Sequence, residues 1–169
     1  DCFEGEFHEP GESKLYKSEV HLNLQPAAIN ETKLSVVNDD CLVVGKQMQD
    51  EGLNPAVLNM ASAYRPGGGV LNGARAQEEC IFRRSNLFMS LYLYDIQMYD
   101  LVIEPNKDDM YDLNFIQQGY PMDENFGGIY SADVTVFKDG KYEWLYDPYQ
   151  TAFISVAAMN INRALRQGE

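Results

Sequence analysis

The sequence predicts a single α/β domain in which short apolar strands alternate with helices around one sheet. Two observations predict it. The 169 residues are 45% hydrophobic and 12% aromatic, a composition typical of a folded chain with a core of its own. Along the first half of the chain, apolar runs of strand length alternate with segments of helical spacing. That order indicates a sheet with right-handed crossovers.

The first half of the chain begins with a polar lead-in over residues 1–30 and continues with apolar runs. In chain order, the expected elements are a short strand around Lys17–Leu24, a buried strand over Lys33–Asn38, a helix from Cys41 to about Asp50, a buried strand over Ala56–Met60 and a long helix from about Ala74 to Leu93. Asp39 or Asp40 can cap the first helix, because a carboxylate accepts hydrogen bonds from its free N–H groups. Gly52 is expected to end it.

The second half contains an irregular excursion followed by further strands. Asp95 to about Asn125 is acidic and tyrosine-rich and contains two prolines, so no regular element is expected there. After it, the expected elements are a strand over Ile129–Lys138, a hairpin turn at Asp139-Gly140, a return strand over Tyr142–Tyr146, a buried strand over Ala152–Ala157 and the beginning of a helix over Asn160–Gly168.

Composition argues against several classes of function. The net charge of −13 opposes attraction to DNA or to acidic membranes, and no apolar run is long enough to span a bilayer. No secretory signal is visible. The three cysteines lack the spacing of a metal site, and the two histidines both lie near the N-terminus. We therefore expect reduced thiols in a cytoplasmic protein, with no metal and no His-dependent triad.

The stretch from Asn59 to Glu79 is the candidate functional segment. It predicts a strand end, then a loop with three consecutive glycines, Gly67, Gly68 and Gly69 (the triglycine loop), then a helix that opens with adjacent carboxylates. Without side chains, the loop amides can turn towards a ligand, and the helix N-terminus favours an anion such as a phosphate. The segment is locally basic, because its arginines between residues 65 and 84 outnumber its acids.

Glu78 and Glu79 suggest hydrolysis beside that anion site. Adjacent helical residues point about 100° apart, so the two carboxylates cannot flank one bond as an inverting pair. A division of labour is expected instead. One carboxylate would hold substrate hydroxyls, and the other would protonate the leaving oxygen and then activate water. The helix N-terminus lowers a carboxyl pKa, so repulsion between like charges and the substrate phosphate would have to raise it.

Each of these residues also has a simpler interpretation. The glycines alone fit a flexible turn, and the two acids fit a first helical turn that complements the helix dipole. Gln77 fits a surface amide, and Asn59 fits a turn former. Arg83 and Arg84 fit a solvated face or salt-bridge partners, and the tyrosines between residues 92 and 130 fit packing rather than adenine stacking.

The motif and its surroundings resemble the microbial-type poly(ADP-ribose) glycohydrolase family. The similar segments are Leu58-Asn-Met-Ala-Ser, the triglycine loop followed by Gln77-Glu-Glu, Phe82-Arg-Arg-Ser-Asn-Leu87, Asn125-Phe-Gly-Gly-Ile-Tyr-Ser131, Val134-Thr-Val-Phe137 and Ile154-Ser-Val-Ala-Ala158. The resemblance extends from about Lys33 to Asn162. The pairing of three glycines with Gln-Glu-Glu is its most specific feature.

The resemblance implies a macrodomain-like, three-layer α/β/α fold with a mixed sheet that binds ADP-ribose. It implies hydrolysis of the ribose–ribose O-glycosidic bonds of poly(ADP-ribose), with release of ADP-ribose and without metal or cofactor. Glu79 would be the acid/base, while Glu78 and Gln77 would orient it and the terminal ribose. Asn59 would contact ribose. The segment lying along the ligand would be Gly67, Gly68, Gly69 and Val70.

The resemblance also sets limits. Family members continue into a second glycine-rich loop around the diphosphate, whereas this chain ends at Glu169. We therefore expect one domain over residues 1–169, truncated relative to the family. Three alternatives stay open: a truncated product, a fragment, or one piece of a protein completed by a complementary C-terminal segment. The rival hypothesis is a macrodomain reader that binds ADP-ribose without cleaving it, and the third is a non-functional remnant. Two carboxylates beside a phosphate site favour the hydrolase, because a reader has no need of them.

Overall fold

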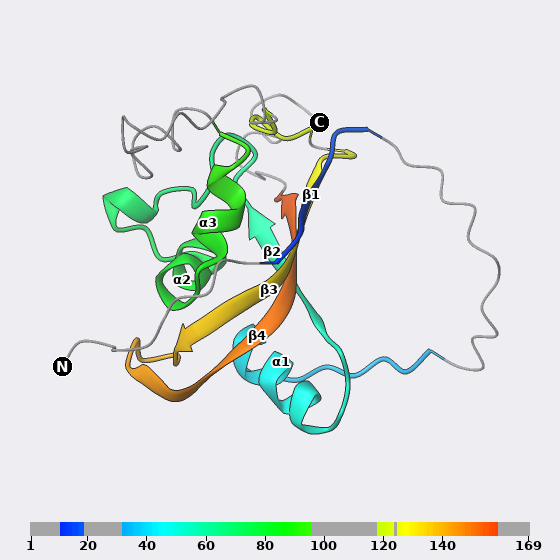
Figure 1. The fold of residues 1–169 in the computed structure, drawn as a ribbon, viewed down its shortest axis with the longest axis vertical. Helices are drawn as coiled ribbons and strands as arrows, with labels where there is room; N and C mark the ends of the chain where they lie inside the picture. The colour runs from blue at the N-terminus through cyan, green and yellow to red at the C-terminus, as the bar shows by residue number, and fades with distance from the viewer. Residues whose placement is uncertain (1–10, 19–31, 96–117, 124, 159–169) are drawn as a thin grey trace.

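The computed structural model describes residues 11–18, 32–95, 118–123 and 125–158 (Figure 1). Their strands form a four-stranded mixed sheet in the order β1-β3-β4-β2. The strands are β1 (Ser13–Tyr16), β2 (Ala56–Ala61), β3 (Gly128–Lys138) and β4 (Trp144–Ala157), and the helices are α1 (Cys41–Asp50), the 3₁₀ turn η1 (Val70–Asn72), α2 (Gln77–Arg84) and α3 (Leu87–Tyr92). None of these helices is long and apolar enough to cross a membrane. The predicted α/β class with a mixed sheet is confirmed.

The sheet joins distant parts of the sequence. β3 and β4 form a long antiparallel hairpin, β1 runs antiparallel to β3, and β2 lies parallel to β4 at the opposite edge. In the β2–β4 register, Asn59 lies opposite Ser155. The loop leaving β2 therefore starts at the carboxyl end of two parallel strands, the edge where open α/β sheets bind ligands.

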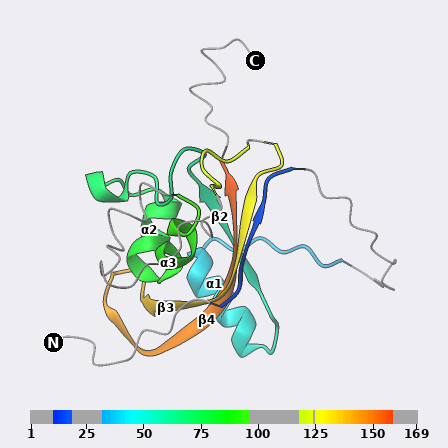
Figure 2. The same cartoon turned by 45° about the horizontal axis from the view of Figure 1, so that its top comes forward.

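All three α-helices lie on one face of this sheet (Figures 1 and 2). On β2, alternate residues Val57, Asn59 and Ala61 point to that face and are buried. The close approach of α1 to β2 is visible at Gly45, where an added Cβ would lie 3.4 Å from a methyl carbon of Val57. α3 meets the same face of β3, because the hydroxyl oxygens of Ser90 and Ser131 lie 2.6 Å apart. The core lies between these helices and the sheet.

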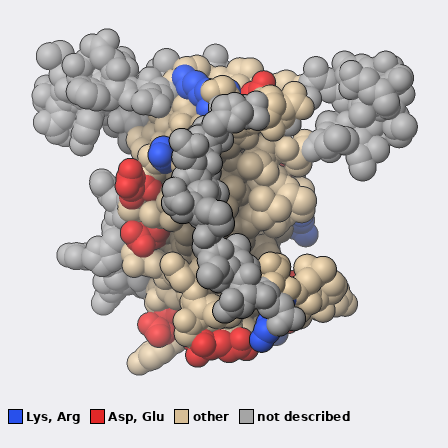
Figure 3. Space-filling view, turned by 90° about the vertical axis from the view of Figure 1, so that its right-hand side faces the viewer, with Lys and Arg blue, Asp and Glu red and all other residues tan. Residues whose placement is uncertain are grey.

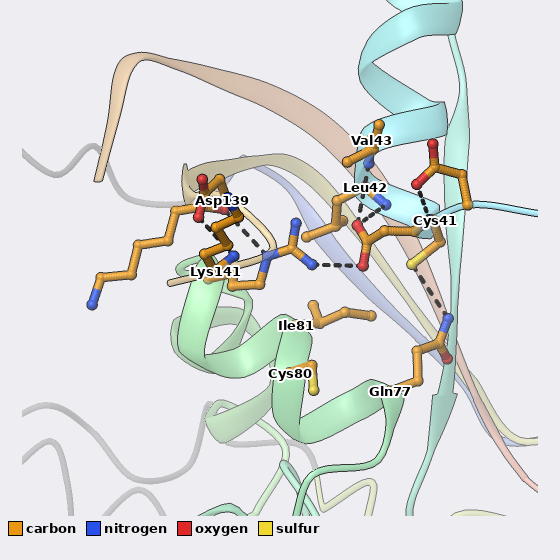
Figure 4. Close-up of polar contacts among 12 residues, drawn as sticks. Cys41, Leu42, Val43, Gln77, Cys80, Ile81, Asp139 and Lys141 are labelled. Atoms are coloured by element: carbon orange, nitrogen blue, oxygen red, sulfur yellow. Dashed lines mark hydrogen bonds and ion pairs between the residues drawn. The ribbon is translucent and has the colours of Figure 1, made fainter. Parts of the chain in front are cut away.

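An ion pair fixes α1 against α2. Asp40 caps α1 by accepting hydrogen bonds from the N–H groups of Leu42 and Val43, and its other oxygen accepts from Arg84 Nη1 at 2.8 Å (Figure 4). Burial opposes ionisation of Asp40, but the hydrogen bond and charge of Arg84 hold its pKa below the usual value. Arg84 Nε also donates to the carbonyl of Lys138, so one buried guanidinium joins α2 to α1 and β3.

Several sequence predictions are confirmed and others are wrong. Confirmed are α1 with its Asp40 cap, the strand at Ala56–Met60, the strand over Ile129–Lys138 and the turn at Asp139-Gly140. The strand predicted at Lys33–Asn38 is wrong, because this segment pairs with no described strand and Leu34 and Val36 are 92% and 94% exposed. Its β-branched residues favour extended backbone without supplying a partner.

The single long helix predicted over Ala74–Leu93 is also wrong. It is divided into α2 and α3, because Ser85 forms a bridge with Val136 and Asn86 exchanges hydrogen bonds with Thr135. Contacts with β3 therefore override the helical spacing of the sequence. The two strands predicted at Tyr142–Tyr146 and Ala152–Ala157 are instead one strand, β4.

Some predictions fall on residues that the structure does not describe. They are most of the strand around Lys17–Leu24, most of the excursion from Asp95 to Asn125 and the helix at Asn160–Gly168. Within the excursion, Tyr120 and Met122 are described and buried, whereas Gln118, Pro121 and Asp123 are exposed.

Candidate active site

The triglycine loop folds back over the start of α2. Gly67 and Gly68 have φ angles of 72° and 51°, in the left-handed region that residues with a Cβ rarely adopt. A Cβ on Gly68 would lie 2.7 Å from Oε1 of Glu79 and 3.2 Å from Oε2 of Glu78. The sequence therefore needs glycine here for two reasons, the backbone turn and the close approach of both carboxylates.

Glu78 closes the loop that joins β2 to α2. Its side chain is buried, with Oε1 accepting from the N–H of Gly67 at 3.0 Å and Oε2 accepting from the N–H of Ser62 at 2.8 Å. Burial, together with the nearby charge of Glu79, raises the pKa of Glu78 to about 7, although the two N–H groups favour the ionised form. Like-charge repulsion was expected from the sequence, but desolvation is the larger cause.

Glu79 is held by only one of its oxygens. Oε1 accepts a hydrogen bond from the N–H of Gly69 at 2.9 Å. Oε2 is buried and has no hydrogen-bond partner within the part of the chain that the structure describes. The hydrogen bond to Gly69 fixes the direction of the carboxylate, and Oε2 is left without a described hydrogen-bond partner.

The amides of the triglycine loop are all engaged within the protein. The N–H groups of Gly67 and Gly69 donate to the two carboxylates, and that of Gly68 donates to the carbonyl of Arg65 at 3.3 Å. The sequence predicts that these amides face a phosphate. In this structure, the anions that they bind are Glu78 and Glu79, so the three N–H groups form no phosphate cradle.

Gln77 caps the outer edge of β2. Its Oε1 accepts from the N–H of Met60 and its Nε2 donates to the carbonyl of Leu58, each at 2.9 Å. The side-chain amide thus replaces a peptide group of a neighbouring strand. Figure 4 shows Gln77 extending from α2 towards Cys41, whose sulfur is 3.6 Å from Nε2. This geometry joins α2 to β2, and the ribose contact of Gln77 remains a prediction.

Asn59 lies beneath the carboxylates, fully buried. Its Nδ2 donates to Oγ of Ser155 at 3.1 Å, and its side chain also forms a hydrogen bond that favours the ionised form of Glu78 and so acts to lower its pKa. Oδ1 of Asn59 has no partner among the described residues. The structure therefore brings Asn59, Gln77, Glu78 and Glu79 together with the triglycine loop. A ribose contact by Asn59 likewise remains a prediction.

Comparison with known families agrees with this geometry. The family model described as "Microbial-type PARG, catalytic domain" matches residues 8–139, which is most of the chain. The chain belongs to this family. The matched segment contains β2, the triglycine loop and both carboxylates. A comparison with curated proteins gives no match.

Solved structures of the family resemble the chain at the level of the fold. Poly(ADP-ribose) glycohydrolase from Thermomonospora curvata, bound to the inhibitor ADP-HPD, matches with 31% identity and a TM-score of 0.56 over 76% of this chain and 43% of that protein. The enzyme from Deinococcus radiodurans, in complex with ADP-ribose, matches with 28% identity and a TM-score of 0.56 over 78% of this chain and 47% of that protein. The chain thus spans less than half of the length of these relatives.

Sequence reasoning missed several residues of the site. Ser62 and Ser155 hold Glu78 and Asn59, and only the similarity of their segments to the family pointed to them. Tyr92 and Tyr120 are buried near Glu78. Burial and the Glu78 charge raise the pKa of both hydroxyls. Tyr92 also packs edge-on against Phe82, with ring centroids 6.0 Å apart, as the packing interpretation of the tyrosines expects.

In residues 11–18, 32–95, 118–123 and 125–158, no group of three or more His, Cys, Asp or Glu side chains could hold a metal ion. Carboxylates such as those of Glu78 and Glu79 are side chains that can transfer protons.

Proposed function

We propose that the chain carries the catalytic carboxylates of a poly(ADP-ribose) glycohydrolase. It would hydrolyse the ribose–ribose O-glycosidic bond and release ADP-ribose, with Glu79 as general acid and base. One observation carries the proposal: Glu79 is anchored through Oε1 to Gly69, while its buried Oε2 has no partner among the described residues.

The hydrogen bonds distinguish the roles of the two carboxylates. Both oxygens of Glu78 accept from backbone N–H groups, so this side chain holds the loop closed. Oε2 of Glu79 accepts no described hydrogen bond, so protonation of this oxygen breaks none. It can donate a proton to the leaving ribose oxygen and then take one from the attacking water. We therefore assign positioning to Glu78 and proton transfer to Glu79.

The surroundings suit the transition state of glycoside cleavage. Such reactions pass through a sugar with oxocarbenium character, which carries a developing positive charge. Glu78 supplies negative charge beside that sugar when it is ionised, and Glu79 becomes negative as it donates its proton. A charge in a water-poor site stabilises the transition state more than it would in bulk water.

The substrate is proposed from the relatives. The Thermomonospora curvata enzyme was solved with the inhibitor ADP-HPD and the Deinococcus radiodurans enzyme with ADP-ribose. We propose that this chain binds ADP-ribose units of poly(ADP-ribose) on modified proteins, with the terminal ribose near Glu79. The free thiols of Cys41 and Cys80 support a cytoplasmic location.

The test is release of ADP-ribose from a poly(ADP-ribosyl)ated protein by the wild-type chain, Glu79→Gln and the control Glu51→Gln. Glu51 is an exposed carboxylate at the end of α1. We expect release by the wild type, unchanged release by the control and a loss of about 10²–10⁴-fold in Glu79→Gln, the usual contribution of a general acid/base. Equal activity in Glu79→Gln would exclude it as the acid. Binding of ADP-ribose without release by the wild type would indicate a reader.

A further inference from the structure

The turn that follows the triglycine loop begins at Gly69, the glycine whose N–H binds Glu79. Gly69 donates its N–H to Glu79, while its carbonyl accepts from the N–H groups of Asn72 at 2.9 Å and Ala74 at 3.1 Å. The position of the Gly69 N–H therefore depends on the turn over residues 69–74, which contains η1. Any displacement of this turn would move the donor that fixes Oε1 of Glu79.

Packing alone holds this turn weakly. Residues 71–74 are exposed, and Gly73 closes the turn with a φ of 78°. Turns with few buried contacts open at low free-energy cost. Within the turn, Val70 packs against the core, so a further contact would stabilise its exposed part.

Arg83 supplies that contact. Its Nη2 donates to the carbonyl of Val70 at 3.2 Å and to that of Ala74 at 2.6 Å, so one nitrogen joins the two ends of the turn. Arg83 follows Glu79 by four residues on α2, which places the two side chains on the same side of the helix. The helix that presents the carboxylate thus also holds the turn that orients it.

The neighbouring Arg84 makes different contacts from Arg83. Arg84 points to the other side of α2, where it binds Asp40 and the carbonyl of Lys138. Arg84 therefore joins α2 to the rest of the domain, whereas the two backbone carbonyls that Arg83 binds belong to the turn beside the active site. Arg83 also interacts with the hydroxyl of Tyr142.

We propose that Arg83 is a positioning residue for Glu79, acting through the turn and the N–H of Gly69. This inference rests on the proposed function only for its effect on turnover. Its structural part concerns the Gly69 amide and holds independently of substrate. Arg83 itself takes no part in proton transfer.

Two substitutions of Arg83 and one control test the proposal. Arg83→Met keeps the aliphatic length and removes every donor, whereas Arg83→Lys keeps the charge and one donor group. Arg75→Met removes a positive charge from an exposed position just after the turn. The measurements are amide hydrogen exchange of residues 69–74 and, on poly(ADP-ribosyl)ated protein, kcat and KM separately.

We expect Arg83→Met to exchange the Gly69 and Ala74 amides about tenfold faster or more, since their protection depends on a closed turn. Its kcat should fall by about 10–100-fold with little change in KM, as for a displaced catalytic group. Arg83→Lys should recover part of both losses, and Arg75→Met should match the wild type.

Three outcomes would overturn the proposal. They are wild-type exchange at Gly69 in Arg83→Met, a loss of stability in that variant without a change in kcat, and an equal effect of Arg75→Met. An inactive wild type would contradict the proposed function alone. In that case, faster exchange at Gly69 in Arg83→Met would still support the positioning role, and unchanged exchange would reject it.

Discussion

The two faces of β2 differ in which side chains they bury, and the sequence alone does not predict this difference. On the face towards the helices, Asn59 is fully buried and interacts with Ser155 and Glu78. On the opposite face, Leu58 and Met60 are about half exposed. A polar residue thus lies inside beside the apolar Val57 and Ala61, while two apolar residues lie outside.

The outer face extends across the sheet. Its exposed apolar side chains are Leu58, Met60, Tyr130 and Ile154, which we call the open sheet face. Figure 3 looks towards this side of the molecule, and the charged side chains drawn there lie mainly near the border of the view. The comparison teaches that burial on β2 follows the demands of the site. Asn59 is inside because the carboxylates need buried hydrogen-bond partners, and alternation alone does not choose between the faces.

The largest expected effect on stability concerns Glu78 and pH. Its folded-state pKa of about 7 lies above the ordinary value of 4.5, so its contribution to stability is fully present below pH 4.5 and is lost as pH rises through 7. The unfolding free energy of the wild type should therefore fall relative to Glu78→Gln over this range, by at most about 3 kcal/mol. Chemical unfolding of the wild type and of Glu78→Gln at several pH values measures this difference in unfolding free energy. A constant difference between them would contradict the buried, destabilised carboxylate.

Two single substitutions, one on each face of β2, should give the next largest effect on stability. Asn59→Leu removes the buried partner of Ser155 and one of the hydrogen bonds to Glu78, and should lower the unfolding free energy by about 2 kcal/mol. The neighbouring change Leu58→Asn, on the open sheet face, should change it by no more than about 0.5 kcal/mol. Urea unfolding of the two variants measures both values. Similar losses in both would show that the faces do not differ as described.

Two glycines with similar backbone angles give the smallest and most specific effect. Gly68→Ala and Gly73→Ala both place a Cβ at positive φ, but the new Cβ at Gly68 meets the carboxylates of Glu79 and Glu78, whereas nothing lies within 4 Å at Gly73. Gly68→Ala should therefore be less stable than Gly73→Ala by about 1–2 kcal/mol, the usual cost of overpacking. Thermal unfolding of the two variants measures this difference in stability. Equal losses would mean that only the backbone angle matters.

The sequence predicts those features that depend on local chemistry. α1 follows from its Asp40 cap, and the hairpin turn follows from Asp139-Gly140, because each signal lies within the element that it defines. The candidate site was located by the three glycines and Gln77-Glu-Glu, which are adjacent in sequence and meet in space.

The sequence does not predict features that depend on distant partners. The helix break at Ser85 requires Val136, and the burial of Asn59 requires Ser155. The amides of the triglycine loop were expected to face a phosphate, because nothing local shows that Glu78 and Glu79 turn back to bind them. Arg83 was taken for a solvated or ion-paired residue for the same reason, since its acceptors are carbonyls of a turn that sequence does not place.

The central claim is that Glu79 performs proton transfer while the rest of the site, Glu78 included, holds it in place. The most direct measurement compares ADP-ribose affinity with turnover in Glu79→Gln. Loss of a group that acts only in the transition state should leave affinity within about threefold of the wild type and reduce turnover by at least about 100-fold. Turnover equal to the wild type, or a loss of affinity as large as the loss of turnover, would contradict the claim.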